Sequence, residues 1–288
     1  MRGVFLFFFS FSGLLIFTSL LFSANNIFLF WLFLELSTLC LVPMYFCSLE
    51  FNGLSSLFNY LIVSSISSSL IVSGVLFESF VVLIVLGLLV KFGLFPFLGW
   101  AYNVILGSNW AVVWGFSTLL KTSFFLIPFF LLGVGSKIAG VSVAFSFLTL
   151  SLFFWFYTYS WRGCWAHMML SSSSCLVAIS YNQSLEVLVL FFIVYLVWSS
   201  SCILLLYTQE SLLLTGVGST FLFCFLFLSL PVSFSIFYKF VLSCCMFSCG
   251  LGVFLVWVFY SLSEQFYLLK FLVDTSLPRS GLGVLGLV

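Results

Sequence analysis

Long apolar runs, interrupted by short polar segments, dominate the chain. Val4 to Phe22, Ile27 to Phe46 and Leu54 to Leu76 are the first three runs. Each has about 20 residues, the length that an α-helix needs to cross the roughly 30 Å hydrocarbon core of a membrane. The runs are too long and too unbroken for the alternating strands of a barrel. The pattern therefore predicts membrane-spanning α-helices.

Further apolar runs follow toward the C-terminus. One run begins at Glu78 and ends near Pro96, and Gly99 to Asn109 has the pattern of an interrupted, partly amphipathic connection. Glycine and proline at such a point predict a broken helix. Four more spans are expected at 111–130, 138–155, 166–181 and 187–207.

The stretch 211–262 carries no charge other than Lys239. As one helix it would be about 78 Å long at 1.5 Å per residue, so it must fold back, and the Pro231 region and Lys239 are the available break points. This gives a ninth and a tenth span. We expect an all-α integral membrane protein with about ten transmembrane helices, two of them broken. Residues 1–262 form its single polytopic domain, and 263–288 form an interfacial or loosely ordered tail.

The composition excludes a water-soluble fold. The 288 residues are 64% hydrophobic and 5% charged, against about 25% charged in an ordinary soluble domain. A net charge of +1 offers no basic patch for nucleic acid, so membrane lipids are the expected surroundings. The nine cysteines predict no metal site, because the closest group, at 244, 245 and 249, has no histidine or carboxylate beside it. The sequence has 42 phenylalanines but only five lysines. This bias indicates a gene rich in U and G codons, such as one in a strand-biased organelle genome.

Four ionisable side chains lie inside predicted spans: Glu35, Lys91, Lys121 and Lys239. Such a group costs at least about 2.5 to 3.5 kcal/mol at the centre of a helix, so it normally faces a partner or a wet cavity. Counting residues places the first three in the middle third of the bilayer. Hydroxyl groups that can bond a lysine or a water lie beside two of them. They belong to Thr38, Ser117, Thr118 and Thr122.

Burial disfavours the charged form of a lysine and a nearby carboxylate favours it. A lysine whose distance to Glu35 can change is therefore a group whose proton occupancy can switch. The alternative is a static ion pair that only orients helices, but such a pair would use one lysine and leave the others in need of different partners. Lys239 could instead cap a helical hairpin and extend to the interface.

His167 lies about one turn into its expected span, beside Arg162 and Trp165. It is either an interfacial histidine that contacts lipid headgroups or a proton relay. Several other charged residues stand at predicted span ends, and we interpret them as anchors and caps. They are Glu50, Glu78, Lys137, Glu186, Glu210 and Glu264.

Four segments carry the central charges. They are WLFLEL around Glu35, LLVKFGLFPFLGW around Lys91, LLKTSFFLIPF around Lys121 and LPVSFSIFYKF around Lys239. In this order they resemble the chain 2 family of NADH:ubiquinone oxidoreductase (respiratory complex I), a mitochondrially encoded, antiporter-like membrane subunit. The Lys-apolar-Gly-apolar-x-Pro-Phe motif at Lys91 is the most specific match. The family's histidine after this motif is absent, and His167 stands at what looks like a lysine position.

The resemblance implies a non-redox subunit of a proton-translocating NADH:ubiquinone reductase in the mitochondrial inner membrane. Glu35, Lys91, Lys121 and Lys239, with His167 as a further candidate, would then translocate protons. The chain itself would bind no cofactor, while FMN, iron–sulfur clusters and ubiquinone would lie elsewhere in the complex. Its partners would be other subunits of the membrane arm. Two other classes remain open: a free-standing cation/proton antiporter and a purely structural membrane spacer.

Overall fold

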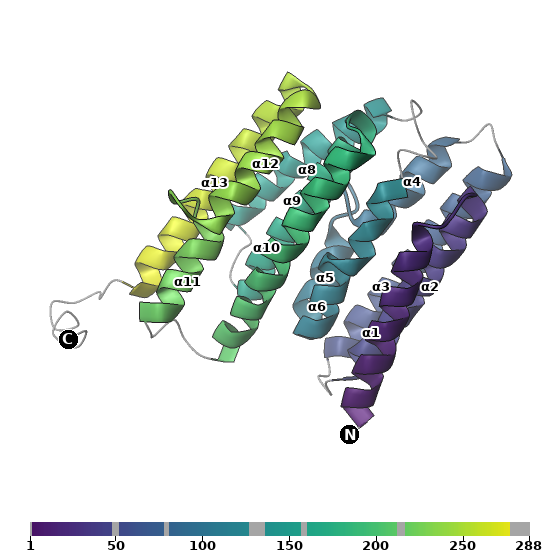
Figure 1. The fold of residues 1–288 in the computed structure, drawn as a ribbon, viewed down its shortest axis with the longest axis horizontal. Coiled ribbons are helices and arrows are strands. Elements are labelled where there is room, and N and C mark those ends of the chain that lie inside the picture. Colours follow the sequence, from purple (N-terminus) through teal and green to yellow (C-terminus); the bar gives the residue numbers. More distant parts are fainter. Residues whose placement is uncertain are drawn as a thin grey trace, which may run out of the picture.

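The computed structural model describes residues 2–47, 52–77, 81–126, 136–156, 160–211 and 217–276, and within these ranges all regular structure is helical. The helices lie side by side, with α1, α2 and α3 at one end of the row and α11, α12 and α13 at the other (Figure 1). The predicted all-α fold is confirmed.

The chain begins at one end of this row and ends at the other, and α8 packs against both α9 and α13. The N-terminal part comprises α1 (Arg2–Leu21), α2 (Ile27–Tyr45) and α3 (Asn52–Leu76). The middle part comprises α4 (Val81–Phe92), α5 (Gly99–Gly107), α6 (Trp110–Ser117) and the 3₁₀ helix η2 (Leu119–Leu126). The C-terminal part comprises α8 (Ser136–Phe156), α9 (Trp161–Asn182), α10 (Leu185–Ser211), α11 (Val217–Phe227), α12 (Phe234–Ser248) and α13 (Leu251–Ser276).

Six of the described helices are long and apolar enough to cross a membrane: α1, α2, α3, α8, α10 and α13. Large apolar side chains on their outer faces are exposed, as Phe5 (71%), Phe58 (65%) and Leu204 (69%) show. Hydrocarbon solvates such side chains, whereas a soluble protein rarely exposes so many together. The chain is therefore a multi-pass membrane protein.

Helix α9 is the exception, because protein surrounds it on every side. It contains His167 and four consecutive serines, yet its residues from Gly163 to Ser180 are all buried. Helices α5, α8, α10 and α12 and the 3₁₀ helix η2 pack around it. A helix with so many hydroxyl groups can lie in a membrane because neighbouring helices, not lipid, cover it.

The predicted break near Lys91 is present between α4 and α5. Gly93 ends α4 with a φ of +66°, and the amides of Gly93 and Leu94 bond back to the carbonyls of Val90 and Leu89 at 3.2 and 3.0 Å. This is the usual glycine C-cap of a helix, which needs a residue that tolerates left-handed backbone. The Trp100 indole also bonds the Val90 carbonyl, at 3.0 Å.

A further change of helix type was not predicted. The sequence suggested one span over 111–130, but α6 ends at Ser117 and the chain continues as the 3₁₀ helix η2, which contains Lys121. Residues 127–130 lie outside the described part. The tighter 3₁₀ winding changes the direction in which Lys121 leaves the backbone.

The second predicted break lies between α11 and α12, around Pro231, where Val232 has a φ of +73°. The sequence suggested that the chain folds back at the Pro231 region or at Lys239. In the structure it folds back at neither position. Helix α12 follows α11 in the same direction, continues through Lys239, and the chain reverses at Gly250 before α13 (Figure 1). Where a tail was expected from Ser263, α13 continues unbroken to Ser276; residues 277–288 lie outside the described part.

Helices α3 and α4 approach each other closely at Gly87. A Cβ atom at this position would lie 2.9 Å from the Ser67 carbonyl oxygen and 2.8 Å from Ile71 Cγ1. The contact involves backbone, so a side chain could fit only if the two helices moved apart.

We expect Gly87→Ala to lower the free energy of unfolding by about 1–3 kcal/mol, the usual cost of overpacking. Gly140→Ala, in α8, is the matched control, because a Cβ there meets no atom within 4 Å. Thermal unfolding of the purified chain in detergent measures both. Equal midpoints for the two variants would show that the close approach of α3 and α4 is not required.

Candidate functional site

Glu35 on α2 and Lys91 on α4 form an ion pair, in which the lysine Nζ donates to Oε1 of the carboxylate. The Lys91 and Glu35 side chains are 9% and 19% exposed. Ser64 on α3 donates to the other carboxylate oxygen at 3.3 Å, and the Thr38 and Ser64 hydroxyls lie 3.4 Å apart. The Glu35 carboxylate therefore links α2, α3 and α4 through its contacts with Ser64 and Lys91.

Lys91 stands in the last turn of α4, just before the Gly93 cap. The carbonyl groups at the end of a helix carry partial negative charge, which favours an ammonium group there. The helix break thus supplies a second source of attraction beside Glu35. A continuous helix at this point would bond those carbonyls internally.

Lys121 is 3% exposed and bonds only neutral oxygens. Its Nζ donates to the Met169 carbonyl at 2.8 Å, to Ser172 Oγ at 2.6 Å and to the Tyr195 hydroxyl at 2.9 Å. The Tyr195 hydroxyl in turn donates to the Ser117 carbonyl at 2.8 Å. Three acceptors match the three hydrogens of an ammonium group. The predicted hydroxyl neighbours Ser117, Thr118 and Thr122 do not supply them; the acceptors come from α9 and α10.

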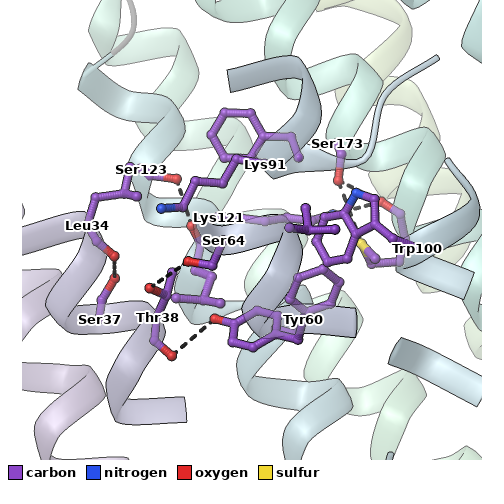
Figure 2. Close-up of a pocket in the computed structure, with 15 residues that line it drawn as sticks. Leu34, Ser37, Thr38, Tyr60, Ser64, Lys91, Trp100, Lys121, Ser123 and Ser173 are labelled. Atoms are coloured by element: carbon purple, nitrogen blue, oxygen red, sulfur yellow. Dashed lines mark hydrogen bonds between the residues drawn. The ribbon is translucent and has the colours of Figure 1, made fainter. Parts of the chain in front are cut away.

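One cavity reaches both Lys91 and Lys121 (Figure 2). Its volume is about 40 Å³, enough for about three or four water molecules at roughly 10–15 Å³ each. Hydroxyl groups and apolar side chains share its wall, and the labelled residues in Figure 2 come from α2, α3, α4, α5, η2 and α9. The polar members besides the two lysines are Ser37, Thr38, Tyr60, Ser64, Ser123 and Ser173. The cavity can therefore hold water between the two lysines.

Lys239 lies apart from this cavity and pairs with Glu264 on α13, at 2.8 Å. The Lys239 and Glu264 side chains are 14% and 7% exposed. The interpretation of Glu264 as an anchor at a span end is wrong, because α13 continues for three more turns beyond it. The suggestion that Lys239 caps a hairpin is also wrong, since it lies within α12.

His167 is 1% exposed, so it is not an interfacial histidine. Its Nδ1 shares a hydrogen bond with the Tyr102 hydroxyl on α5. Aromatic rings enclose it, with centroids 5.1 Å away for Tyr102, 4.8 Å for Phe154 and 6.3 Å for Phe153. The residue is thus buried beside the Tyr102 hydroxyl, in the same helix as two of the three acceptors of Lys121.

The structure brings together Glu35, Lys91 and Lys121, and places Lys239 and His167 at separate positions. Sequence reasoning missed four functional candidates. They are Ser64, Ser172, Tyr195 and Glu264. The serine run in α9 was the one signal for Ser172, since four hydroxyl groups in a buried helix need partners.

The other residues interpreted as anchors are only partly described. Glu186 is exposed at the start of α10, as an anchor would be. Glu50 and Glu78 lie outside the described residues, as do the side chains of Lys137 and Glu210. Among the described residues, no group of three histidine, cysteine or acidic side chains could hold a metal ion.

Comparison with known proteins finds a likeness in structure only. No protein-family model matches the sequence, and no curated protein matches it. Among solved structures, the chain is similar to a chain of respiratory complex I from Thermus thermophilus with bound aureothin, with a TM-score of 0.78 and 17% identity. The alignment covers 96% of this chain and 72% of that chain. The two chains share a fold.

Removal of one partner from the Glu35–Lys91 pair should destabilise the protein more than removal of both. We expect Glu35→Gln to cost about 3 kcal/mol of unfolding free energy, because it leaves a buried ammonium without its carboxylate. The double variant Glu35→Gln/Lys91→Met should recover at least half of that loss. Unfolding in detergent measures the two single variants, Glu35→Gln and Lys91→Met, and the double variant. Strictly additive single effects would contradict a paired charge.

Proposed function

We propose that the chain is a proton-translocating, antiporter-like membrane subunit of a respiratory complex I, that is, an NADH:ubiquinone oxidoreductase. The observation that carries the proposal is the cavity that reaches both Lys91 and Lys121 between membrane helices. Buried ionisable groups beside a water-sized cavity are typical of proton paths. The shared fold with a chain of the Thermus complex supports membership of such an assembly.

Each central residue has a role that follows from its surroundings. In contact with Lys91, the Glu35 carboxylate stabilises the ammonium form. When the pair separates, that stabilisation is lost and Lys91 can pass its proton through water in the cavity. Lys121 accepts the proton when its amine is neutral, and the three oxygens around its Nζ then stabilise the ammonium group that forms. Lys239 exchanges protons with one side of the membrane or with a neighbouring subunit, and His167 is a further candidate relay.

The redox chemistry in this proposal takes place elsewhere in the assembly. FMN, iron–sulfur clusters and ubiquinone would be bound by other subunits, and the energy of electron transfer would reach this chain as a shift of charge along its central residues. The proposed location is the mitochondrial inner membrane, in keeping with the phenylalanine-rich composition. Its neighbours there would be the other membrane-arm subunits and lipids.

Membership of the assembly can be tested directly. Mildly solubilised membranes are separated by native gel electrophoresis, stained for NADH oxidation and searched for this chain by mass spectrometry. We expect the chain in a large, NADH-oxidising band. A small independent species, with ion exchange by the purified chain in liposomes, would instead identify a free-standing cation/proton antiporter.

The pumping role predicts a selective defect in Lys121→Met. We expect the assembly to form and oxidise NADH but to lose most of its proton transport, because the cavity no longer ends in a proton acceptor. Lys270→Met is the matched control, since Lys270 is exposed on α13. The measurement is the number of protons transported per NADH oxidised in liposomes, compared between the two variants. Full coupling in Lys121→Met would favour a structural spacer.

A further inference from the structure

Helix α13 presents two neighbouring polar residues, Glu264 and Gln265, to the break between α11 and α12. Gln265 bonds groups on the α11 side of this break: its Oε1 accepts from the amide and the hydroxyl of Ser229, both at 2.9 Å. Its Nε2 donates to the Phe227 carbonyl at 3.3 Å and to Glu264 Oε1 at 3.2 Å. These bonds fix the register of α13 against the break.

This register places Glu264 beside Lys239. Helix α12 begins directly after the break, and Ser233 caps it by accepting from the Ile236 amide at 3.2 Å. Lys239 follows less than two turns later, and its Nζ lies 2.8 Å from Glu264 Oε1. Glu264 is 5% exposed, and a carboxylate buried to this extent is stable only with a partner. The ion pair is therefore part of the core.

Tyr260 connects the pair to the central helix. It lies one turn before Glu264 on the same face of α13, and its side chain is 2% exposed. Its hydroxyl donates to the His167 carbonyl on α9 at 3.5 Å. Ser172, also on α9, bonds Lys121. Helix α13 thus contacts Lys239 through Glu264 and α9 through Tyr260, and α9 supplies two of the three acceptors of Lys121.

We propose that Glu264 is a positioning residue for Lys239, the C-terminal counterpart of Glu35. It holds the Lys239 ammonium beside the break and, through Tyr260, fixes its place relative to α9. The central charges then comprise two lysine–glutamate ion pairs, Glu35–Lys91 and Glu264–Lys239. Lys121, which donates to neutral oxygens, lies between these pairs. The inference rests on the proposed function and adds to it a residue that no comparison assigns.

The test compares variants in the intact, NADH-oxidising assembly in liposomes. We expect Glu264→Gln to assemble and to lower the protons transported per NADH to the level of Lys239→Met, because Lys239 is no longer held in place. Glu264→Asp keeps the charge and should restore most of the transport, which a merely space-filling role would not explain. Glu186→Gln, at an exposed glutamate of α10, should transport normally.

The double variant Glu264→Gln/Lys239→Met completes the experiment. If the two residues act together, its transport equals that of either single variant. Where Glu264→Gln alone fails to assemble, the double variant should assemble again, because no unpaired charge remains; a second failure would overturn the proposal. Normal transport in Glu264→Gln beside a defective Lys239→Met would also overturn it, whereas normal transport in Lys239→Met would count against the proposed function itself.

Discussion

The cost of burying a charge among membrane helices governs this structure. In the described part of the chain, three lysine ammonium groups lie between the helices. Lys91 and Lys239 each pair with a carboxylate, that of Glu35 and of Glu264, whereas Lys121 donates to three neutral oxygens. A group without such partners would cost several kcal/mol. The positions of α2, α4, η2, α9, α10, α12 and α13 relative to one another follow from the need to bring these partners together.

Interruptions of the helices make these solutions possible. Lys91 precedes the Gly93 cap, Lys121 lies in the 3₁₀ segment after α6, and Lys239 follows the break at Pro231. At each interruption backbone groups lose their regular partners, and side chains such as Trp100 and Gln265 bond them. The buried lysines and the irregular backbone therefore occur together in this chain. The irregular backbone provides polar groups in the surroundings of the charged side chains.

Much of this arrangement could be predicted from the sequence. Apolar run length gives the helices, and the rarity of charge within the runs singles out Glu35 and the lysines. The partner choices could not be predicted, because they depend on contacts between helices far apart in the chain. Glu264 shows the difficulty: the residues after it fit a continuing helix, but nothing near it in the sequence indicates that it faces Lys239 or that Gln265 fixes its register. The 3₁₀ winding at Lys121 likewise has no local signal comparable to Gly93.

The burial of α9 has a consequence for how the chain is made. With His167, Arg162 and the serine run at 171–174, this helix partitions poorly into lipid by itself. Its hydroxyl groups are shielded from lipid only when neighbouring helices cover them. Among these neighbours are α8 and α10, the helices before and after it in sequence. We therefore expect α9, the most polar of the described helices, to enter the bilayer together with these neighbours during synthesis.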